Sequence, residues 1–225
     1  MLNWAARYYP IVRTLKANNL FHEGSLLEIG SGAIGIGRFR KVPFVGCDLS
    51  FAEPPVWPMT PMTASAAQLP IKDGQFDVVV ASDVLEHVPP ELRPAVIGEA
   101  LRVARKLVIF GFPSGRPAWE SDRDLYNTYI NAGQSPPGWL AEHMEAPFPD
   151  TELFQTVDGW HIQRAGNENL RFHSWLMTKE MSYRFVRASM AAMRAAPFLL
   201  ELLLRRADRP PCYRQIVTLS RLHQN

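Results

Sequence analysis

Short apolar runs alternate with polar segments along the first half of the chain. Four runs rich in Val, Ile, Leu and Phe predict strands over 25–29, 43–47, 76–81 and 106–111, and a fifth strand is expected over 59–64. The segments between these runs predict helices, most clearly over 91–104. Strands that alternate with helices indicate a parallel sheet with helices on both faces, which is a doubly wound α/β fold.

The pattern changes after Phe112, where aromatic and proline residues become frequent. We predict a helix over 120–132, a structured loop over 136–149, a short helix over 151–157, a strand over 160–164, and a helical region over 176–207 interrupted near Pro197. An alternating last strand over 215–220 gives seven strands, and we expect it to be an antiparallel edge strand. A further amphipathic helix is expected over 1–16, broken near Pro10.

The first strand leads into a glycine-rich turn, with glycines at 30, 32 and 35. Gly30 can take a positive φ, Gly32 lets a ligand lie against bare backbone, and a helix is expected to follow. Asp48 ends the next strand, 20 residues after Glu28. A carboxylate there suits a bidentate grip on two ribose hydroxyls, so we predict a nucleoside-containing cofactor at the carboxyl edge of the sheet.

The glycine spacing alone also fits a nicotinamide dinucleotide. A carboxylate at Glu28 would repel a pyrophosphate, but it suits the ammonium and sulfonium of S-adenosylmethionine (SAM). The sequence therefore favours SAM, with a nicotinamide-dependent oxidoreductase as the alternative.

Four ordered stretches resemble the class I SAM-dependent methyltransferases of the small-molecule type. They are LLEIGSGAIGIGRF at 26–39, VGCDLS at 45–50, ASAAQLPIKDGQFDVVV at 64–80 and ASDVLEHVPP at 81–90. The resemblance covers residues 20–112 and implies a Rossmann-like fold with a helical C-terminal elaboration, and SAM as cofactor. The cofactor contacts that it implies are Glu28, Gly30, Ser31, Gly32, Asp48, Leu49, Ser65, Ala66, Ser82 and Asp83.

The chain departs from the family pattern at two of these places. Ser65 stands where an acid often binds the adenine amino group, and Ile34 stands where a third glycine is common. An uncharged Ser65 would bind adenine more weakly than an acid. This departure keeps open a second alternative, in which the chain is a non-catalytic partner subunit with a SAM-binding fold.

Methyl transfer to a hydroxyl acceptor needs a base, and two histidines are candidates. His87 begins the turn after the fourth strand, and His143 lies beside Glu142 in the loop expected to overhang the site. His87 could equally hold its turn, and Asp83 could cap the following helix. The other histidines, His22, His161, His173 and His223, are expected on the surface or in packing. With no cluster of carboxylates and Asn in the sequence, we predict no metal.

The composition of the chain indicates its domain number, its partner class and its cellular compartment. The 225 residues are 47% hydrophobic and carry a net charge of +2, which predicts a single domain and no nucleic-acid partner. Within it, residues 1–112 would bind SAM and residues 113–225 would form the substrate side. Cys47 and Cys212 are expected as reduced thiols of a cytoplasmic protein, and the arginine-rich usage is typical of a bacterial one.

One apolar segment near the C-terminus could contact a membrane. The helical stretch 190–207 contains the almost wholly apolar run 198–204, followed by Arg205 and Arg206. Such a segment can lie on a membrane surface. The run is short, so we favour a buried helix with a solvated arginine rim.

Overall fold

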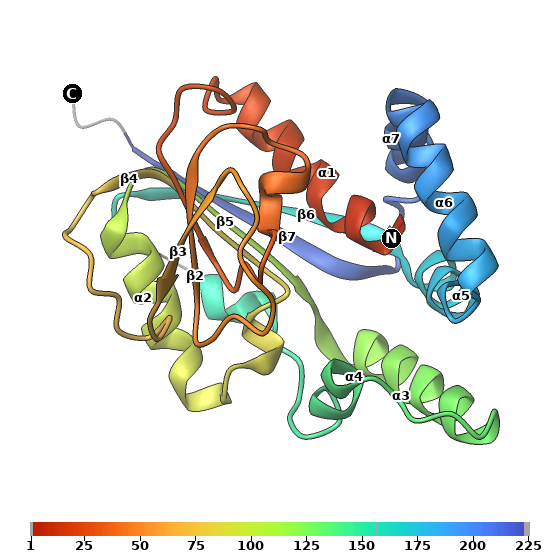
Figure 1. Cartoon of the computed structure of the whole chain (residues 1–225). Helices are drawn as coiled ribbons and strands as arrows, with labels where there is room; N and C mark the ends of the chain where they lie inside the picture. Colours follow the sequence, from red (N-terminus) through yellow and green to blue (C-terminus); the bar gives the residue numbers. More distant parts are fainter. Residues whose placement is uncertain (1, 156, 223–225) are drawn as a thin grey trace.

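A single seven-stranded sheet forms the centre of the protein in the computed structural model, which describes residues 2–155 and 157–222. The strand order is β3-β2-β1-β4-β5-β7-β6 (Figure 1). Their bounds are β1 Leu26–Ile29, β2 Phe44–Asp48, β3 Met59–Thr63, β4 Phe76–Ser82, β5 Ala104–Pro113, β6 Trp160–Asn169 and β7 Cys212–Arg221. Strands β1 to β5 are parallel, and β7 is antiparallel to both of its neighbours. The doubly wound, mostly parallel fold class is therefore confirmed.

The last strand is antiparallel as expected, but it does not form the edge of the sheet. Strand β6 pairs along the outer side of β7, from the pair Trp160–Arg221 to the pair Asn169–Cys212. This long pairing also explains why β6 is ten residues long, well beyond the 160–164 predicted from the apolar pattern. Only three of the ten residues of β6 are buried, so its sequence carried little strand signal.

Two helices cover the two faces of the sheet. Helix α1 (Leu2–Ala17) packs Tyr8, Ile11 and Leu15 onto one face, and α2 (Arg93–Val103) packs on the other. The remaining helices are α3 (Gly115–Asn131), α4 (Gly138–Glu142), α5 (Leu170–Glu180), α6 (Tyr183–Ala195) and α7 (Pro197–Arg206). Short 3₁₀ turns are η1 (Gly35–Arg38), η2 (Leu85–His87), η3 (Pro90–Leu92) and η4 (Thr151–Phe154).

Helix α1 continues through Pro10, which contradicts the expected break. A proline inside a helix leaves the carbonyl four residues earlier without its usual N–H partner. Here that carbonyl belongs to Ala6, and the Asn167 side-chain amide of β6 donates to it over 3.3 Å. A residue remote in sequence therefore replaces the lost hydrogen bond and keeps the helix whole.

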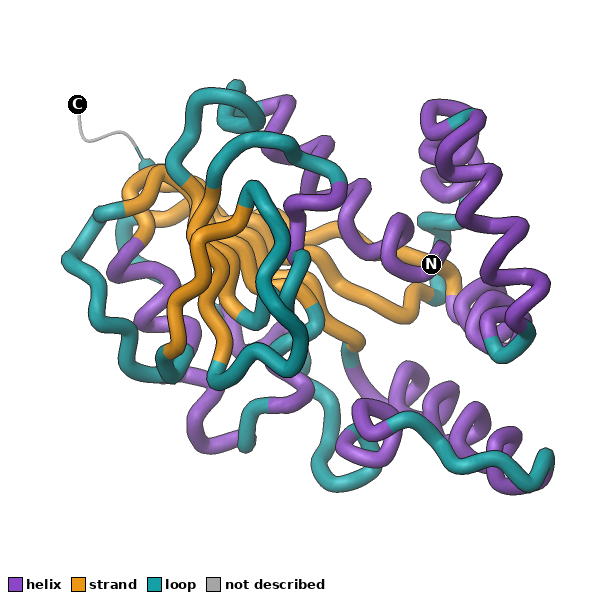
Figure 2. The backbone as a smooth tube through the Cα atoms, viewed as in Figure 1, coloured by secondary structure: helices purple, strands orange, loops and turns teal. Residues whose placement is uncertain are grey.

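Among the connections from β1 to β5, α2 is the only α-helix within the described residues. The predicted helix after the glycine turn is a single 3₁₀ turn, η1, and the β2–β3 and β3–β4 connections are loops (Figure 2). The connection after β1 forms no α-helix because it contains Gly35, Gly37 and Pro43, and glycine and proline are poor helix formers. Helix α1 covers the face that a crossover helix would otherwise occupy.

The C-terminal half differs from its prediction in where helices begin and end. Helix α3 begins at Gly115, α4 lies inside the predicted 136–149 loop, and 151–157 forms only η4, with residue 156 outside the described residues. The predicted 176–207 region is three helices, broken near Ser182 as well as near Pro197. Helices α3 and α5 follow the carboxyl ends of β5 and β6, so the added helices gather at one end of the sheet (Figure 1).

Candidate active site

The glycine turn after β1 is held in a conformation that side chains would disturb. Gly30, Gly32 and Gly35 have φ values of +68°, +53° and +48°. A Cβ atom on Gly30 would overlap Val84, and one on Gly35 would overlap the Glu28 carboxylate. The backbone therefore passes close to Val84, just after β4, on one side and to Glu28 on the other.

Asp48 fixes the turn to the end of β2. Its Oδ2 accepts a hydrogen bond from the Gly32 amide over 2.9 Å, and its Oδ1 accepts one from the Leu49 amide over 2.8 Å. The side chain is half-buried and lines a cavity. A carboxylate offers about four acceptor positions, so lone pairs remain for two ribose hydroxyls.

This cofactor cavity has a volume of about 330 Å³ and lies at the carboxyl ends of β1, β2 and β4. Six residues expected at the cofactor line it: Gly30, Asp48, Leu49, Ser65, Ala66 and Asp83. His87, Val88 and Leu92 add to its wall. A mostly apolar hollow with one carboxylate at a strand end suits an adenosine group, so the residues present fit the implied cofactor.

Glu28 lies beneath the glycine turn and does not line the cavity. It is buried, its Oε1 accepts from the Tyr8 hydroxyl over 2.7 Å, and its Oε2 accepts from the Ile36 amide over 2.7 Å. Burial raises the pKa of Glu28 to about 7 against these hydrogen bonds. We expected the charge of Glu28 to contact the cofactor directly and so to favour SAM over a dinucleotide. Glu28 is not in position for such a contact from the cavity wall, and it instead joins α1 to the turn.

Ser31, Gly32 and Ser82 are also absent from the cavity wall. The Ser31 hydroxyl donates to the Gly32 carbonyl over 3.0 Å, and Ser82 is buried at the end of β4. These residues shape the backbone around the cavity, with the Gly32 amide committed to Asp48.

A second cavity of about 220 Å³ adjoins the first, because Asp83 and His87 line both. The other residues around it come from α1, η2, the α4 region, α5 and β7: Asn3, Arg7, Glu86, Trp139, His143, His173, Met177, Tyr213 and Arg214. We call it the acceptor cavity. Ionisable side chains dominate its wall, in contrast to the first cavity.

Asp83 joins the two cavities and is held by two arginines. Arg214 donates to both of its carboxylate oxygens over 2.7 and 2.9 Å, and Arg7 donates over 3.1 Å. Burial alone would raise the Asp83 pKa, but the two guanidinium groups outweigh it and hold the pKa well below its usual value. Asp83 does not cap the next turn, since η2 has no side-chain cap.

His143 is buried in the acceptor cavity and is oriented by a carboxylate from another helix. Its Nδ1 lies 2.6 Å from Asp122 Oδ2, an oxygen that also accepts from the Tyr213 hydroxyl over 2.7 Å. An ionised Asp122 assigns the proton to Nδ1, which leaves Nε2 as an acceptor. Nε2 has no partner within the described part of the chain.

The rings of His87 and His143 lie next to each other, with centroids 4.9 Å apart and planes tilted by 42°. Glu142 contacts His87, where its Oε2 lies 2.8 Å from Nδ1, and it does not orient the adjacent His143. The neighbouring residues Glu142 and His143 therefore point to different partners, as adjacent helical positions do.

Comparison with known proteins gives a family match for part of the chain. Residues 43–110 match the family model described as a methyltransferase domain. This segment carries a methyltransferase domain, and the sheet has the strand order of the class I SAM-dependent methyltransferase fold. This finding favours a SAM-dependent methyltransferase over a nicotinamide-dependent oxidoreductase. A sequence search of curated proteins found no match to this chain.

Two solved structures share the fold of the methyltransferase. A candidate sarcosine dimethylglycine methyltransferase from Galdieria sulphuraria superposes with a TM-score of 0.56 at 13% identity, over 96% of this chain and 84% of its own. Magnesium protoporphyrin IX methyltransferase from Synechocystis PCC 6803, with bound S-adenosylhomocysteine, gives 0.52 at 17% identity, over 97% and 84%. At such identities the likeness establishes the fold.

The acceptor cavity of the methyltransferase contains residues that the sequence did not point to. His173, expected on the surface or in packing, is buried with Nδ1 3.2 Å from Glu168 Oε2 and Nε2 3.7 Å from Asp122 Oδ1. Burial lowers the His173 pKa, but the two carboxylates outweigh it and raise it. Asp122, Arg7, Tyr213 and Arg214 were missed as well, since each lies on a helix or strand with no motif around it.

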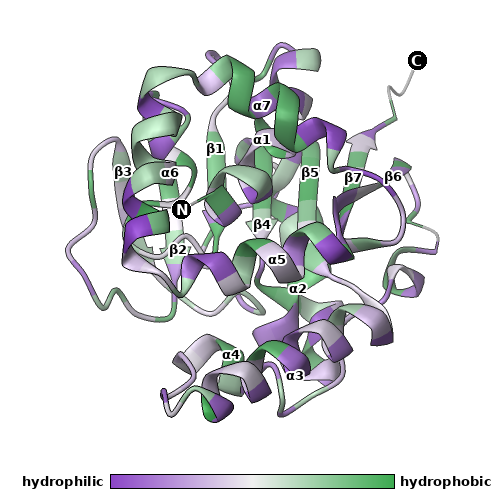
Figure 3. Ribbon diagram, turned by 90° about the vertical axis from the view of Figure 1, so that its right-hand side faces the viewer, coloured by the Kyte–Doolittle hydropathy of each residue, from purple (hydrophilic) through white to green (hydrophobic). Residues whose placement is uncertain are grey.

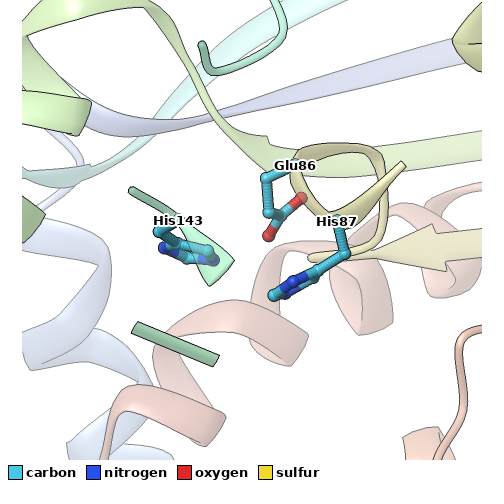
Figure 4. Close-up of side chains that lie close together, drawn as sticks. All are labelled: Glu86, His87 and His143. Atoms are coloured by element: carbon cyan, nitrogen blue, oxygen red, sulfur yellow. The ribbon is translucent and has the colours of Figure 1, made fainter. Parts of the chain in front are cut away.

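Glu86, His87 and His143 form a cluster in which one donor atom of each lies within 4.8 Å of the others (Figure 4). Glu86 is buried and neither carboxylate oxygen has a partner within the described residues. Burial, and then the nearby Asp83, raise its pKa well above the usual value. These donor types could hold a cation, a possibility that the sequence alone did not suggest, or they could accept hydrogen bonds from a bound acceptor molecule.

Proposed function

We propose that this methyltransferase transfers the methyl group of SAM to a hydroxyl of a small molecule bound in the acceptor cavity. The observation that carries the proposal is the free Nε2 of His143. This buried acceptor nitrogen lies beside His87, and His87 lines the cofactor cavity as well. A proton acceptor next to the methyl-donor site is what a hydroxyl nucleophile requires.

The cofactor supplies an electrophilic methyl group when bound. Residues Gly30, Asp48, Leu49, Ser65, Ala66 and Asp83 would contact it, with Asp48 on the ribose. Glu28, Ser31, Gly32 and Ser82 would support these contacts from behind the cavity wall.

His143 would act as the base. Its Nε2 takes the acceptor proton, and Asp122 stabilises the imidazolium that forms because its carboxylate already accepts from Nδ1. His87, tethered by Glu142, would position the acceptor between the two cavities. Orientation by these groups supplies much of the rate in a direct displacement.

The two halves of the chain would act as one catalytic unit. Strand β5 from the first half pairs with β7 from the second over seven residue pairs. Arg214 of β7 reaches across to Asp83, which follows β4. The acceptor cavity needs side chains from both halves, which supports a single functional domain.

The test combines cofactor binding with an acceptor panel. Calorimetry should show binding of S-adenosylhomocysteine and no binding of NAD or NADP. With SAM carrying a tritiated methyl group, sugars, phenols and hydroxylated metabolites should be labelled, and their amino analogues should not.

His143→Ala should abolish labelling and keep cofactor affinity, and His161→Ala, an exposed position on β6, is the matched control. Labelling of amines alone would contradict the hydroxyl proposal. Full turnover in His143→Ala would remove the proposed base.

A further inference from the structure

Helix α7 exposes an apolar surface to solvent, although its sequence favoured a buried helix. Phe198 is 80% exposed, Leu199 55%, Leu203 51% and Leu202 41%. These positions follow the i, i+1, i+4, i+5 spacing of one helical face. Figure 3 shows α7 at the outside of the molecule, coloured mostly as hydrophobic. We call these four residues the α7 face.

The opposite side of α7 already has its partner. Leu200 and Leu204 pack against Tyr9 and neighbouring residues of α1. That side alone therefore packs α7 onto the rest of the chain. The α7 face is additional apolar surface, and a cluster of this kind marks an interaction site.

The charges beside the α7 face have one sign. Arg205 and Arg206 are exposed at the end of the helix, and Arg194 is exposed just before it. The two acids of the region point the other way, since Glu201 and Asp208 both pair with Arg13 of α1 over 4.0 and 3.2 Å. The outer surface therefore combines exposed leucines and phenylalanine with arginines that form no ion pair among the described residues.

We propose that the α7 face docks the enzyme onto an anionic lipid bilayer. An apolar helical face flanked by arginines inserts at the level of the headgroups, while the guanidinium groups contact lipid phosphates. A second copy of this chain fits less well, because a symmetric contact would bring the two sets of arginines together. No helix in the described part of the chain has the length and hydropathy to cross a bilayer, so the contact is a surface one.

Vesicle sedimentation tests the proposal with the full-length protein. We expect binding to vesicles that contain phosphatidylglycerol, at least tenfold weaker binding to pure phosphatidylcholine, and release by high salt. Phe198→Ser with Leu203→Ser, and Arg205→Glu with Arg206→Glu, should each reduce the partition coefficient roughly tenfold or more.

Two control variants make the same chemical changes on another exposed helix. Ile130→Ser and Arg123→Glu on α3 replace exposed residues and should leave vesicle binding unchanged. Unaltered melting temperature and S-adenosylhomocysteine affinity in all variants would show that the fold and the methyltransferase site are intact.

Equal sedimentation of parent and α7 variants, or no sedimentation with anionic vesicles, would overturn the proposal. A dimer in analytical ultracentrifugation that Phe198→Ser with Leu203→Ser dissociates, without vesicle binding by the parent, would assign the face to self-association instead. None of these outcomes depends on acceptor turnover, so they are separable from the proposed reaction.

Discussion

The cofactor cavity is lined mostly by small and apolar side chains from residues 29–96, whereas the acceptor cavity is lined by ionisable side chains from residues 3–214. The first is built by strand ends and turns that follow one another along the chain. The second joins α1, η2, the α4 region, α5 and β7. The two share only Asp83 and His87.

This difference indicates how each cavity responds to change. Apart from the shared Asp83, the cofactor cavity relies on backbone shape and the carboxylate of Asp48, so most single substitutions there should be graded in effect. In the acceptor cavity, Arg214 binds both Asp83 and Glu168, and Glu168 in turn contacts His173. Removing one member of such a buried network leaves a charge without its partner, which is costly.

The largest expected effect comes from Asp122→Asn in the acceptor cavity. An amide at this position can donate to His143 Nδ1, which would move the ring proton to Nε2 and remove the base. We expect turnover to fall about 10²- to 10⁴-fold, with affinity for S-adenosylhomocysteine unchanged. Single-turnover kinetics and calorimetry measure the two quantities.

The exposed Asp124 on the same helix provides the control, as Asp124→Asn. It should behave like the parent in both measurements. Turnover of Asp122→Asn within twofold of the parent would show that proton removal does not pass through His143.

The same contrast explains what the sequence could predict. Strands β1 to β5, the glycine turn and Asp48 follow from local patterns, because each is defined by neighbouring residues. His143 was found as a candidate, but its partner was not, since Asp122 lies 21 residues earlier on another helix. The missing crossover helices were also unpredictable locally, because α1 occupies their place through contacts distant in sequence.

Glu28 gives the next largest effect, and it concerns stability. Its pKa is about 7 in the folded protein against an ordinary value of 4.5. Between these pH values the folded chain keeps a proton that the unfolded chain has lost, so stability falls as pH rises. The free energy of unfolding should fall by on the order of 3 kcal/mol between low pH and pH values above the folded pKa.

Glu28→Gln should remove this pH dependence, because an amide resembles the protonated acid. Urea unfolding at pH 5 and pH 8 measures it, and the parent should lose stability relative to the variant at the higher pH. The exposed Glu23→Gln is the control. Parallel losses in the parent and in Glu28→Gln would show that Glu28 keeps no proton at neutral pH.

Asp48→Ala should have a graded effect on the cofactor cavity. Loss of a charge-assisted hydrogen-bond pair should weaken S-adenosylhomocysteine binding by about 1–3 kcal/mol. The melting temperature without ligand should change little, since the side chain is half-buried. Glu53→Ala, exposed in the following loop, is the control in the same calorimetric titration. Equal affinity in Asp48→Ala and the parent would remove Asp48 from the cofactor contacts.

The smallest effect concerns α1, the helix on which both cavities depend. It supplies Arg7 to the acceptor cavity and Tyr8 to Glu28 beneath the glycine turn. Asn167→Ala would leave the Ala6 carbonyl without a donor, so we expect unfolding to become easier by about 1 kcal/mol. In a Pro10→Ala background the restored N–H can bond Ala6, and the same substitution should then cost less. A double-mutant cycle by urea unfolding measures this coupling. Equal costs in the two backgrounds would show that Asn167 acts through its bond to Asp208 alone.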